Sequence, residues 1–348
     1  MNNIINKLDF PYDVSFVVIS KNESFTITRC IKSIIRCGEA LLNYEIIFID
    51  SLSSDNTLER VNAIKNKHLR IFLITKSANA AVARNIGIEH VKYEYIFFVD
   101  GDVEIQADFV FAAIEEMINS PQIGAIYGQL KEFQYYSNYN KIYQIVKDRY
   151  NIQKRIFQIV RGGIFFTRYS VVNDIGNFDI RLKTGEDLDC LLRIMSKYRV
   201  LGLPIIMGTH HTVAYRNIIR IKEWLFDFKY RYTGLLLRKH ILNIDRALII
   251  LKKEYGLTLG ILFWPLLFSN IFFPSIFIKI IFGLFLLGDI FLGFKKKPKH
   301  LIGRIISHYI FSVYFLFGFL FYFPRKKKIE YKEISYDRKL FKREIDKV

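Results

Sequence analysis

Four short runs of β-branched and aromatic residues occupy the first hundred positions, and a helical pattern of apolar residues separates each run from the next. Runs that are apolar throughout, instead of alternating with polar residues, are typical of parallel strands with both faces buried. We therefore predict strands at residues 14–19, 44–49, 69–74 and 95–99. Their alternation with helices predicts an α/β fold with a doubly wound, mostly parallel sheet, which binds ligands beyond the carboxyl ends of its strands.

Two nearly continuous apolar blocks follow near the end of the chain, Leu257–Phe294 and Leu301–Phe323, and basic runs flank them at Lys295–Lys299 and Arg325–Lys328. The formal net charge is +18, and the last 54 residues hold 15 Lys and Arg against 5 Asp and Glu. Cations beside apolar blocks favour an anionic membrane surface as partner, and not a nucleic acid. We expect C-terminal hydrophobic membrane helices.

The composition predicts four regions: a catalytic domain over residues 1–240, a juxtamembrane linker over 241–256, membrane-associated helices over 257–323 and a basic tail over 324–348. The number of crossings stays open, because basic runs tend to remain on the cytoplasmic side. The first block can form a hairpin, and the second can be re-entrant or lie along the interface.

The N-terminal start, Met1–Asp13, is polar and has no signal-peptide core, so we expect a catalytic domain that faces the cytoplasm. Three cysteines, Cys30, Cys37 and Cys190, lack metal-site spacing and are expected to be free thiols.

The sharpest local motif is Asp100-Gly101-Asp102, directly after the fourth predicted strand. Asp and Gly are common in turns, but two carboxylates at a ligand-binding sheet edge suit Mg²⁺, which is usually shared between one or two carboxylates and substrate phosphates. A second acidic group, Glu186-Asp187 with Asp189, opens a predicted helix. Such acids can simply favour the helix dipole, or one can be a general base, and Asp189 should point elsewhere.

Two further sets complete the candidates. His210-His211 follows a short apolar strand predicted at residues 200–207 and is either structural or a source of one extra metal ligand. Asp50 ends the second strand and Arg84 lies early in a helix at residues 80–90, where they could hold a nucleobase and a diphosphate.

In this order the motifs resemble the inverting glycosyltransferase family 2, whose catalytic domain has the GT-A fold, over about residues 14–214. The motifs that carry the resemblance are Val17-Val18-Ile19-Ser20-Lys21-Asn22-Glu23, the strand ending at Asp50 with Asp55 and Thr57, Ala83-Arg84-Asn85-Ile86-Gly87, Asp100-Gly101-Asp102, Glu186-Asp187 and His210.

The resemblance implies a role for each candidate. Nucleotide-sugar contacts are implied for Ser20, Asn22, Glu23, Asp50, Arg84, Asp100, Gly101 and Glu186. Binding of Mg²⁺ or Mn²⁺ is implied for Asp102 and Asp100, with His210 or His211 near the metal, and Asp187 is implied as the catalytic base.

Two departures from the family pattern matter. The second-strand motif usually reads Asp-Asp-Gly-Ser, and here Asp50-Ser-Leu-Ser stands in its place. The Gln-x-x-Arg-Trp motif of processive synthases is missing between Arg216 and Arg238, which favours transfer of one sugar per encounter. The expected function is a membrane-attached, metal-dependent glycosyltransferase in cell-surface glycan synthesis. It would use a nucleotide-sugar, expected to be UDP-linked, and a saccharide or polyprenyl-linked acceptor. The alternative is a non-catalytic membrane scaffold that binds nucleotide-sugar.

Overall fold

A computed structural model describes residues 11–136, 139, 141–147, 149–157, 162–213, 229–273, 275–296, 301–325 and 328–334 of the 348-residue chain. The chain divides into two compact units, Met1–Tyr215 with Lys326–Val348, and Arg216–Arg325. The second unit thus begins near residue 216, whereas the sequence places the end of the catalytic domain near 240. The first ten residues, and most of the basic runs and of the 324–348 tail, lie outside the described residues.

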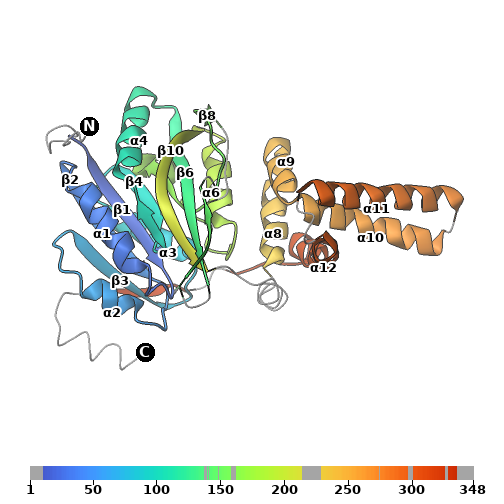
Figure 1. The fold of residues 1–348 in the computed structure, drawn as a ribbon, viewed down its shortest axis with the longest axis horizontal. Coiled ribbons are helices and arrows are strands. Elements are labelled where there is room, and N and C mark those ends of the chain that lie inside the picture. Colours follow the sequence, from blue (N-terminus) through green and yellow to red (C-terminus); the bar gives the residue numbers. More distant parts are fainter. Residues whose placement is uncertain are drawn as a thin grey trace. The chain divides into compact units, whose positions relative to one another are not determined.

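The first unit is built on a sheet in the order β11-β3-β2-β1-β4-β9-β6-β10-β5, with β7 on β6 and β8 on β10 (Figure 1). The four predicted strands are confirmed as β1 (Asp13–Ser20), β2 (Asn43–Asp50), β3 (Leu69–Lys76) and β4 (Tyr95–Asp100). They pair in parallel, β3-β2-β1-β4. Most of their side chains are buried on both faces of the sheet, and their sequences are accordingly mainly apolar.

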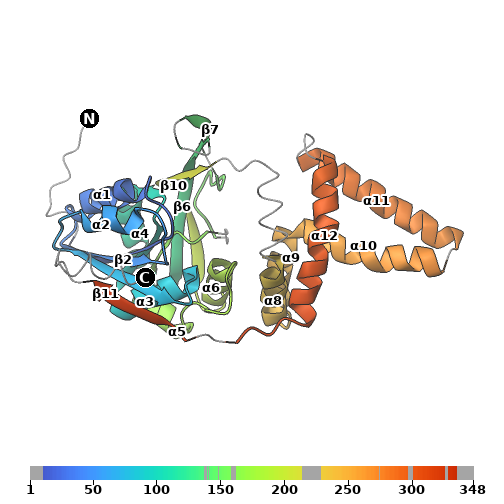
Figure 2. The same cartoon turned by 90° about the horizontal axis from the view of Figure 1, so that it is seen from below.

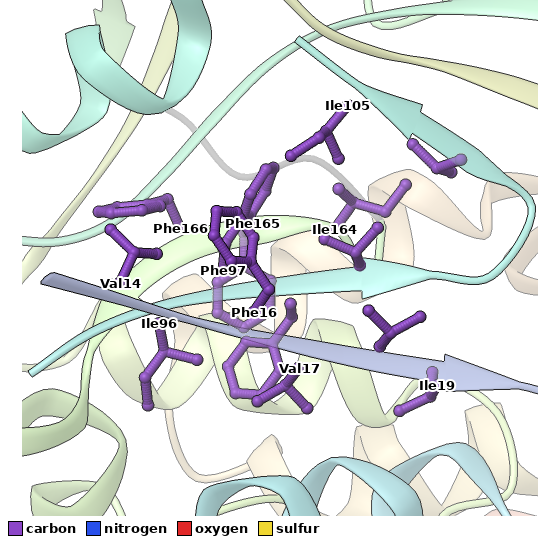
Figure 3. Close-up of a cluster of buried hydrophobic side chains, with 14 of the residues drawn as sticks. Val14, Phe16, Val17, Ile19, Ile96, Phe97, Ile105, Ile164, Phe165 and Phe166 are labelled. Carbon is purple, nitrogen blue, oxygen red and sulfur yellow. The ribbon is translucent and has the colours of Figure 1, made fainter. Parts of the chain in front are cut away.

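Helices cover both faces of this sheet (Figure 2). On one face α1 (Ile27–Gly38) contacts α4 (Ala107–Asn119), and on the other α3 (Ala80–His90) contacts α6 (Glu186–Ile194). The short helices α2 (Thr57–Asn62) and α5 (Tyr169–Asp174) complete the unit. Figure 3 shows part of the core, where Phe16, Phe97 and Phe166 lie opposite one another on three adjacent strands and are fully buried. All three cysteines are buried and free, as expected.

The second half of the sheet corrects the expectation of a mostly parallel sheet. It comprises β5 (Val103–Ile105), β6 (Ile123–Tyr135), β7 (Ile142–Val146), β8 (Ile156–Phe157), β9 (Phe165–Arg168) and β10 (Arg199–Val213). Only β6 and β10 pair in parallel here, and β9 lies antiparallel between β4 and β6. Parallel neighbours need a long crossover. Strands β6 to β9 follow one another with no helix between them in the described residues, and β7 and β9 both pair antiparallel with β6. The sheet is therefore mixed.

A strand that the sequence analysis did not predict closes the other edge of the sheet. Strand β11 (Glu330–Ile334) pairs antiparallel with β3. Arg70 reaches Glu333 through two nitrogens, at 2.9 and 3.2 Å, and the Tyr331 hydroxyl lies 3.1 Å from His90 Nε2. Strand β11 thus covers backbone groups of β3 that would otherwise form an open edge.

We expect a chain ending at Arg325 to lose this cover. Without β11, backbone amides of Leu69–Lys76 should exchange with solvent at least about tenfold faster, because an unpaired edge opens locally. Amides of Asp13–Ser20, in the sheet interior, serve as the internal reference in hydrogen-exchange mass spectrometry. The variant Glu333→Gln should change little, since its ion pair with Arg70 is partly exposed. Unchanged exchange in β3 would contradict a structural role for β11.

The second unit is helical: α8 (Tyr230–His240), α9 (Ile244–Lys253), α10 (Tyr255–Phe272), α11 (Ile276–Lys296) and α12 (Leu301–Leu320). Glycines allow α8 and α12 to cross closely, because a Cβ on Gly234 would lie 2.0 Å from the Phe315 carbonyl oxygen and one on Gly318 would lie 2.0 Å from that of Arg231.

The two predicted apolar blocks correspond to α10, α11 and α12. Within the described part of the chain, no single helix has both the length and the apolar character to cross a membrane. Only Ile244–Lys253 and Gly256–Phe272 taken together, with a 92° bend between them, meet that requirement by length and composition.

Candidate active site

The carboxyl ends of β1, β2 and β4 meet at one edge of the sheet. Ser20 lies in register with Asp50, and Asp100 lies beside Ile19. Two backbone hydrogen bonds, from Ser51 N to the Ser20 carbonyl and from Gly101 N to the Ile19 carbonyl, both 2.9 Å, hold the following loops against β1. The strand-end residues that the sequence singled out are therefore brought together.

The first two loops are joined by a network of hydrogen bonds. Asn22 Oδ1 accepts from Ser54 N at 2.7 Å, and Glu23 N donates to Thr57 Oγ1 at 2.8 Å. The Asp50 carboxylate is buried: Oδ1 accepts from Ser53 N at 2.9 Å, while Oδ2 has no hydrogen-bond partner among the described residues. Burial raises the pKa of Asp50. An unsatisfied buried acceptor is costly unless a ligand or water supplies a donor.

The loop after β1 also touches the Asp100-Gly101-Asp102 turn. Ser20 Oγ donates to Glu23 Oε2 at 2.9 Å, and a Cβ on Gly101 would lie 2.2 Å from that same oxygen. Burial and the neighbouring Asp102 raise the pKa of Glu23 well above its usual value. A Cβ on Gly101 would also lie 2.9 Å from Ser20 Cβ, so a larger residue between the two aspartates would force the Ser20–Glu23 loop to shift.

Arg84 joins two of the predicted carboxylates. Its Nη2 donates to Asp100 Oδ1 at 2.9 Å and its Nη1 donates to Glu186 Oε1 at 2.8 Å. The side chain is 3% exposed and its Nε has no partner among the described residues. From the sequence Arg84 is expected near the diphosphate, but in this structure both of its terminal nitrogens donate to carboxylates. Arg84 therefore links β4 to α6.

The charges of this cluster influence one another strongly. Burial and the adjacent Asp187 raise the pKa of Glu186 to about 7. Burial also raises the pKa of Asp100, although Arg84 opposes the shift. Burial alone would lower the pKa of Arg84, but Asp100 and Glu186 outweigh it and the pKa is raised. Arg84 thus carries the positive charge that allows three acids to lie together.

Asp187 differs from its neighbours on α6. Its carboxylate is nearly buried, yet it forms no hydrogen bond or ion pair with any residue that the structure describes. Its charge nevertheless raises the pKa of Glu186 and of Asp100. Asp189, in contrast, is fully buried and accepts from Arg193 Nε at 2.9 Å, as expected for a residue that points elsewhere. Of the three acids on α6, Asp187 is therefore the one whose carboxylate has no partner among the described residues.

Asp102 faces the first of the two histidines. His210 Nε2 lies 2.9 Å from Asp102 Oδ2, and His210 Nδ1 lies 3.0 Å from Glu132 Oε2. Hydrogen bonds with Asp102 and Glu132 outweigh burial and raise the pKa of His210 to about 9. The hydrogen bond to His210 lowers the pKa of Glu132 most, and the one to Gln134 lowers it further. Burial opposes both, and the resulting pKa is about 2.

His211 points to the other face of β10, as the alternation of a strand requires. Its Nδ1 lies 2.8 Å from the Tyr135 hydroxyl and its Nε2 lies 2.9 Å from Glu104 Oε1, without hydrogen-bond geometry at Nε2. Burial lowers the pKa of His211. The structure therefore brings the His210 imidazole to the Asp102 carboxylate, whereas His211 contacts Asp102 through its backbone, with its N–H donating to the Asp102 carbonyl at 2.8 Å.

The residues present fit one hard divalent cation. Asp102 Oδ2 and His210 Nε2 already converge to 2.9 Å, a separation that two ligands of one ion can have. The described residues contain no preformed group of three or more His, Cys, Asp or Glu side chains for a metal. Mg²⁺ and Mn²⁺ accept such a partial set when substrate phosphates and water supply the remaining ligands.

Residues 15–176 match the model of the family described as Glycosyl transferase family 2, and this segment includes the ends of β1, β2 and β4 with the Asp100–Asp102 turn. Residues 15–176 are therefore the part of the chain that matches a glycosyl transferase family 2 domain. The predicted resemblance is confirmed for this domain, whose family consists of glycosyltransferase enzymes. Glu186, Asp187 and His210 lie beyond the matched segment.

Curated relatives of the family 2 domain are named poly-beta-1,6-N-acetyl-D-glucosamine synthase. The protein from Staphylococcus epidermidis is 34% identical over 119 residues, which cover 33% of this chain and 28% of the relative. The protein from Staphylococcus aureus (strain COL) is 28% identical over 208 residues, which cover 56% of this chain and 48% of the relative. The matches therefore span less than half the length of these relatives.

Two solved structures share the fold. TarS residues 1–349 from S. aureus, in complex with UDP, aligns with a TM-score of 0.51 at 16% identity and covers 94% of this chain and 97% of that one. The mannosyltransferase PcManGT from Pyrobaculum calidifontis, in complex with GDP-Man and Mn²⁺, aligns with a TM-score of 0.57 at 16% identity and covers 90% and 89%. At this identity the likeness concerns the fold, which is a mixed α/β, GT-A-like one.

Several residues of the family 2 domain escaped the sequence analysis. They are Glu132, Arg149, Tyr150 and Gly163. A Cβ on Gly162 would lie 2.4 Å from the Tyr150 hydroxyl, and Gly163 lies against Arg84 and Asp100. Burial raises the pKa of Tyr150, as do the charges of Asp100 and Asp187, while Arg149 opposes the shift. The Gly162-Gly163 pair was the one available signal, because paired glycines often mark a close approach.

We expect the Gly163→Ala substitution to disturb this cluster. A Cβ at this position would lie 1.9 Å from Arg84 Nη2, which Asp100 holds in place, so the guanidinium must move. Overpacking of this kind costs about 1–3 kcal/mol, and transfer activity should fall with it. Melting temperature and donor turnover are the measurements.

The matched control is Gly283→Ala in α11, where a Cβ meets no atom within 4 Å. It should be neutral or slightly stabilising. Equal effects of the two variants would contradict the close approach at Gly163.

Proposed function

We propose that the chain is an inverting, metal-dependent glycosyltransferase, which moves a sugar from a nucleoside diphosphate sugar to a hydroxyl acceptor. The observation that carries the proposal is the unpartnered carboxylate of Asp187 beside the Asp100–Arg84–Glu186 cluster. A base must reach a proton of the substrate, so a carboxylate without a protein partner suits that role.

In the proposed reaction Asp187 takes the proton of the acceptor hydroxyl. The acceptor oxygen attacks the anomeric carbon while the bond from that carbon to the diphosphate oxygen breaks, and the nucleoside diphosphate leaves. When bound, Mg²⁺ or Mn²⁺ would be held by Asp102 and His210 and would neutralise the charge of the leaving diphosphate. Arg84 keeps Asp100 and Glu186 in place, so that these acids are oriented before the donor arrives.

The nucleobase would be recognised at the end of β2. The unpaired Asp50 Oδ2 suits the imide N–H of uracil, and the adjoining Ser20, Asn22 and Glu23 loop would line the donor site. We therefore propose a UDP-linked sugar. A structural neighbour was solved with UDP and another with GDP-Man, so a guanine base is the competing choice.

We further propose that the helical unit attaches the enzyme to an anionic membrane, with the catalytic domain on the cytoplasmic side. Large apolar side chains of α10 and α11 are more than half exposed, among them Leu262, Phe268, Ile271, Phe272, Ile276, Phe277, Leu284, Leu287 and Phe291. Apolar exposure on this scale is unusual for a helix that meets only water. The acceptor would be a saccharide or a polyprenyl-linked saccharide in cell-surface glycan synthesis.

The test of the function uses the full chain in detergent with UDP- and GDP-sugars, each with Mn²⁺, Mg²⁺ or EDTA. We expect hydrolysis or transfer of a UDP-sugar that EDTA abolishes and Mn²⁺ restores. If only GDP-sugars are turned over, the assignment of uracil as the nucleobase of the donor is wrong. Nucleotide binding without turnover of any donor would favour the non-catalytic scaffold, although Asp100, Asp102 and Asp187 are all present.

The membrane proposal has its own test. The chain should float with vesicles that contain phosphatidylglycerol and float less with neutral phosphatidylcholine vesicles, because basic residues flank the apolar helices. If the protein stays in the vesicle-free fraction to the same extent with both vesicle types, the membrane proposal is wrong.

A further inference from the structure

The side chain behind His210 is an acid from the neighbouring strand. Glu132 on β6 lies in parallel register with His210 on β10, so both side chains project from the same face of the sheet. Glu132 Oε2 lies 3.0 Å from His210 Nδ1, on the opposite side of the ring from Asp102. Both side chains are largely buried, which limits competition from water.

Glu132 is itself held by two further residues. Arg149 Nη1 donates to Glu132 Oε2 at 2.6 Å, and Gln134 Nε2 donates to Oε1 at 2.5 Å. The same Arg149 nitrogen lies 3.0 Å from His210 Nδ1. His210 Nδ1 therefore has two neighbours of opposite kind. The Glu132 carboxylate can only accept a hydrogen bond, and the Arg149 guanidinium can only donate one.

These two neighbours favour different forms of the ring. In the neutral ring with Glu132 as partner, Nδ1 carries the proton and the lone pair of Nε2 is directed at the space beside Asp102 Oδ2. With Arg149 as partner, Nδ1 must accept, and in the neutral ring the proton then sits on Nε2, where it excludes a metal ion. Histidine ligands of metals almost always donate their other N–H to a carboxylate or carbonyl, and loss of that partner typically costs 10–100-fold in affinity.

We propose that Glu132 is a positioning residue that selects the metal-binding form of His210, and that Arg149, although it bonds to Glu132, is not needed for that selection. The inference rests on the proposed metal dependence and deepens it. Nothing in the family match or the named relatives assigns a role to either residue.

The experiment measures Mn²⁺ affinity of the full chain by electron paramagnetic resonance of free Mn²⁺, without donor or acceptor. Glu132→Met keeps the size of the side chain but leaves Arg149 alone beside Nδ1, so we expect affinity to fall by about 10–100-fold. Arg149→Met leaves Glu132 in place and should change affinity by less than about threefold, since a partly exposed ion pair contributes little.

The double variant Glu132→Met/Arg149→Met gives the decisive comparison. With neither neighbour present the ring is free to adopt either form, so affinity should recover part of the loss seen in Glu132→Met. Glu132→Gln retains an oxygen acceptor and should lie closer to the wild type. If Glu132 has only a structural role, the Mn²⁺ affinities of the variants should fall in step with their melting temperatures, and the double variant should bind Mn²⁺ most weakly.

Glu45→Gln is the matched stability control. Glu45 is also a buried acid with side-chain and backbone donors, Ser15 Oγ at 2.7 Å and Lys92 N at 2.5 Å, but it lies at the opposite end of the strands. It should lower the melting temperature and leave Mn²⁺ affinity unchanged.

The failure modes are distinguishable. If Glu132→Met binds Mn²⁺ with the wild-type affinity, the positioning role is overturned and the metal dependence stands. The same holds if the double variant binds Mn²⁺ more weakly than Glu132→Met does. Absence of Mn²⁺ binding by the wild type, both alone and with UDP added to supply phosphate ligands, would overturn the metal dependence and the positioning role together.

Discussion

The Asp187→Asn variant should lose sugar transfer by about 10²–10⁴-fold while it still binds the nucleotide and melts at the wild-type temperature. A positioned general base contributes a factor of this size, and the amide cannot take the acceptor proton. Stability should be retained because the carboxylate has no hydrogen-bond or ion-pair partner among the described residues. Single-turnover transfer, UDP binding by calorimetry and the melting temperature are the three measurements.

Asp189→Asn on the same helix is the matched control. Asp189 is buried and paired with Arg193, whose remaining nitrogens donate to the Ile175 and Asn177 carbonyls at 2.6 Å. Its substitution should lower the melting temperature while the folded fraction keeps its turnover. The prediction for Asp187 is wrong if Asp187→Asn retains transfer, or if the two variants lose activity and stability in parallel.

Arg84→Met should destabilise the first unit by about 3–5 kcal/mol, since removal of one partner from a buried ion pair leaves uncompensated charge. Here the substitution leaves two acids without their cation at once, Asp100 and Glu186, which Arg84 contacts at 2.9 and 2.8 Å. Transfer should fall as well, because both acids line the proposed donor site. Hydrogen-exchange protection of β1 and β4 amides reports the stability of this unit without interference from the helical unit.

Two comparisons isolate the charge effect. The double variant Arg84→Met/Glu186→Gln should regain part of the lost stability, because one of the stranded charges is gone. Arg155→Met breaks an exposed pair with Glu116 and should cost at most about 1 kcal/mol. If Arg84→Met costs no more than Arg155→Met, the cluster is not the electrostatic link described above.

The parallel half of the fold could be predicted from sequence because its signal is local. Residues Val14–Ile19, for example, are apolar or small throughout, and such a run fits only where both faces of a strand are covered. The same reasoning located Asp50 and Asp100, since a strand that ends at a polar residue places it at a defined edge. Helix 80–90 was likewise predicted with its observed bounds.

The remaining parts depend on pairing between distant segments. Strand β11, Glu-Tyr-Lys-Glu-Ile, is half polar because it lies at an exposed edge, so its sequence does not distinguish it from a solvated tail. Glu132 becomes a neighbour of His210 only through the register of β6 with β10. Which of His210 and His211 lies near Asp102 depends on the same register, because the register decides which face of the sheet each imidazole occupies.

The position of β11 also has a consequence for the order in which the protein is made. Arg70 and its partner Glu333 are separated by 263 residues, which a ribosome needs roughly 10–50 s to add. Throughout that interval, while the helical unit emerges, the nascent sheet carries an open edge at β3. Charged side chains at Arg70 and Lys76 lie on that edge and disfavour pairing with another nascent chain. A polypeptide released early would keep the edge open, so the cell's proteases and chaperones could distinguish it from a finished chain.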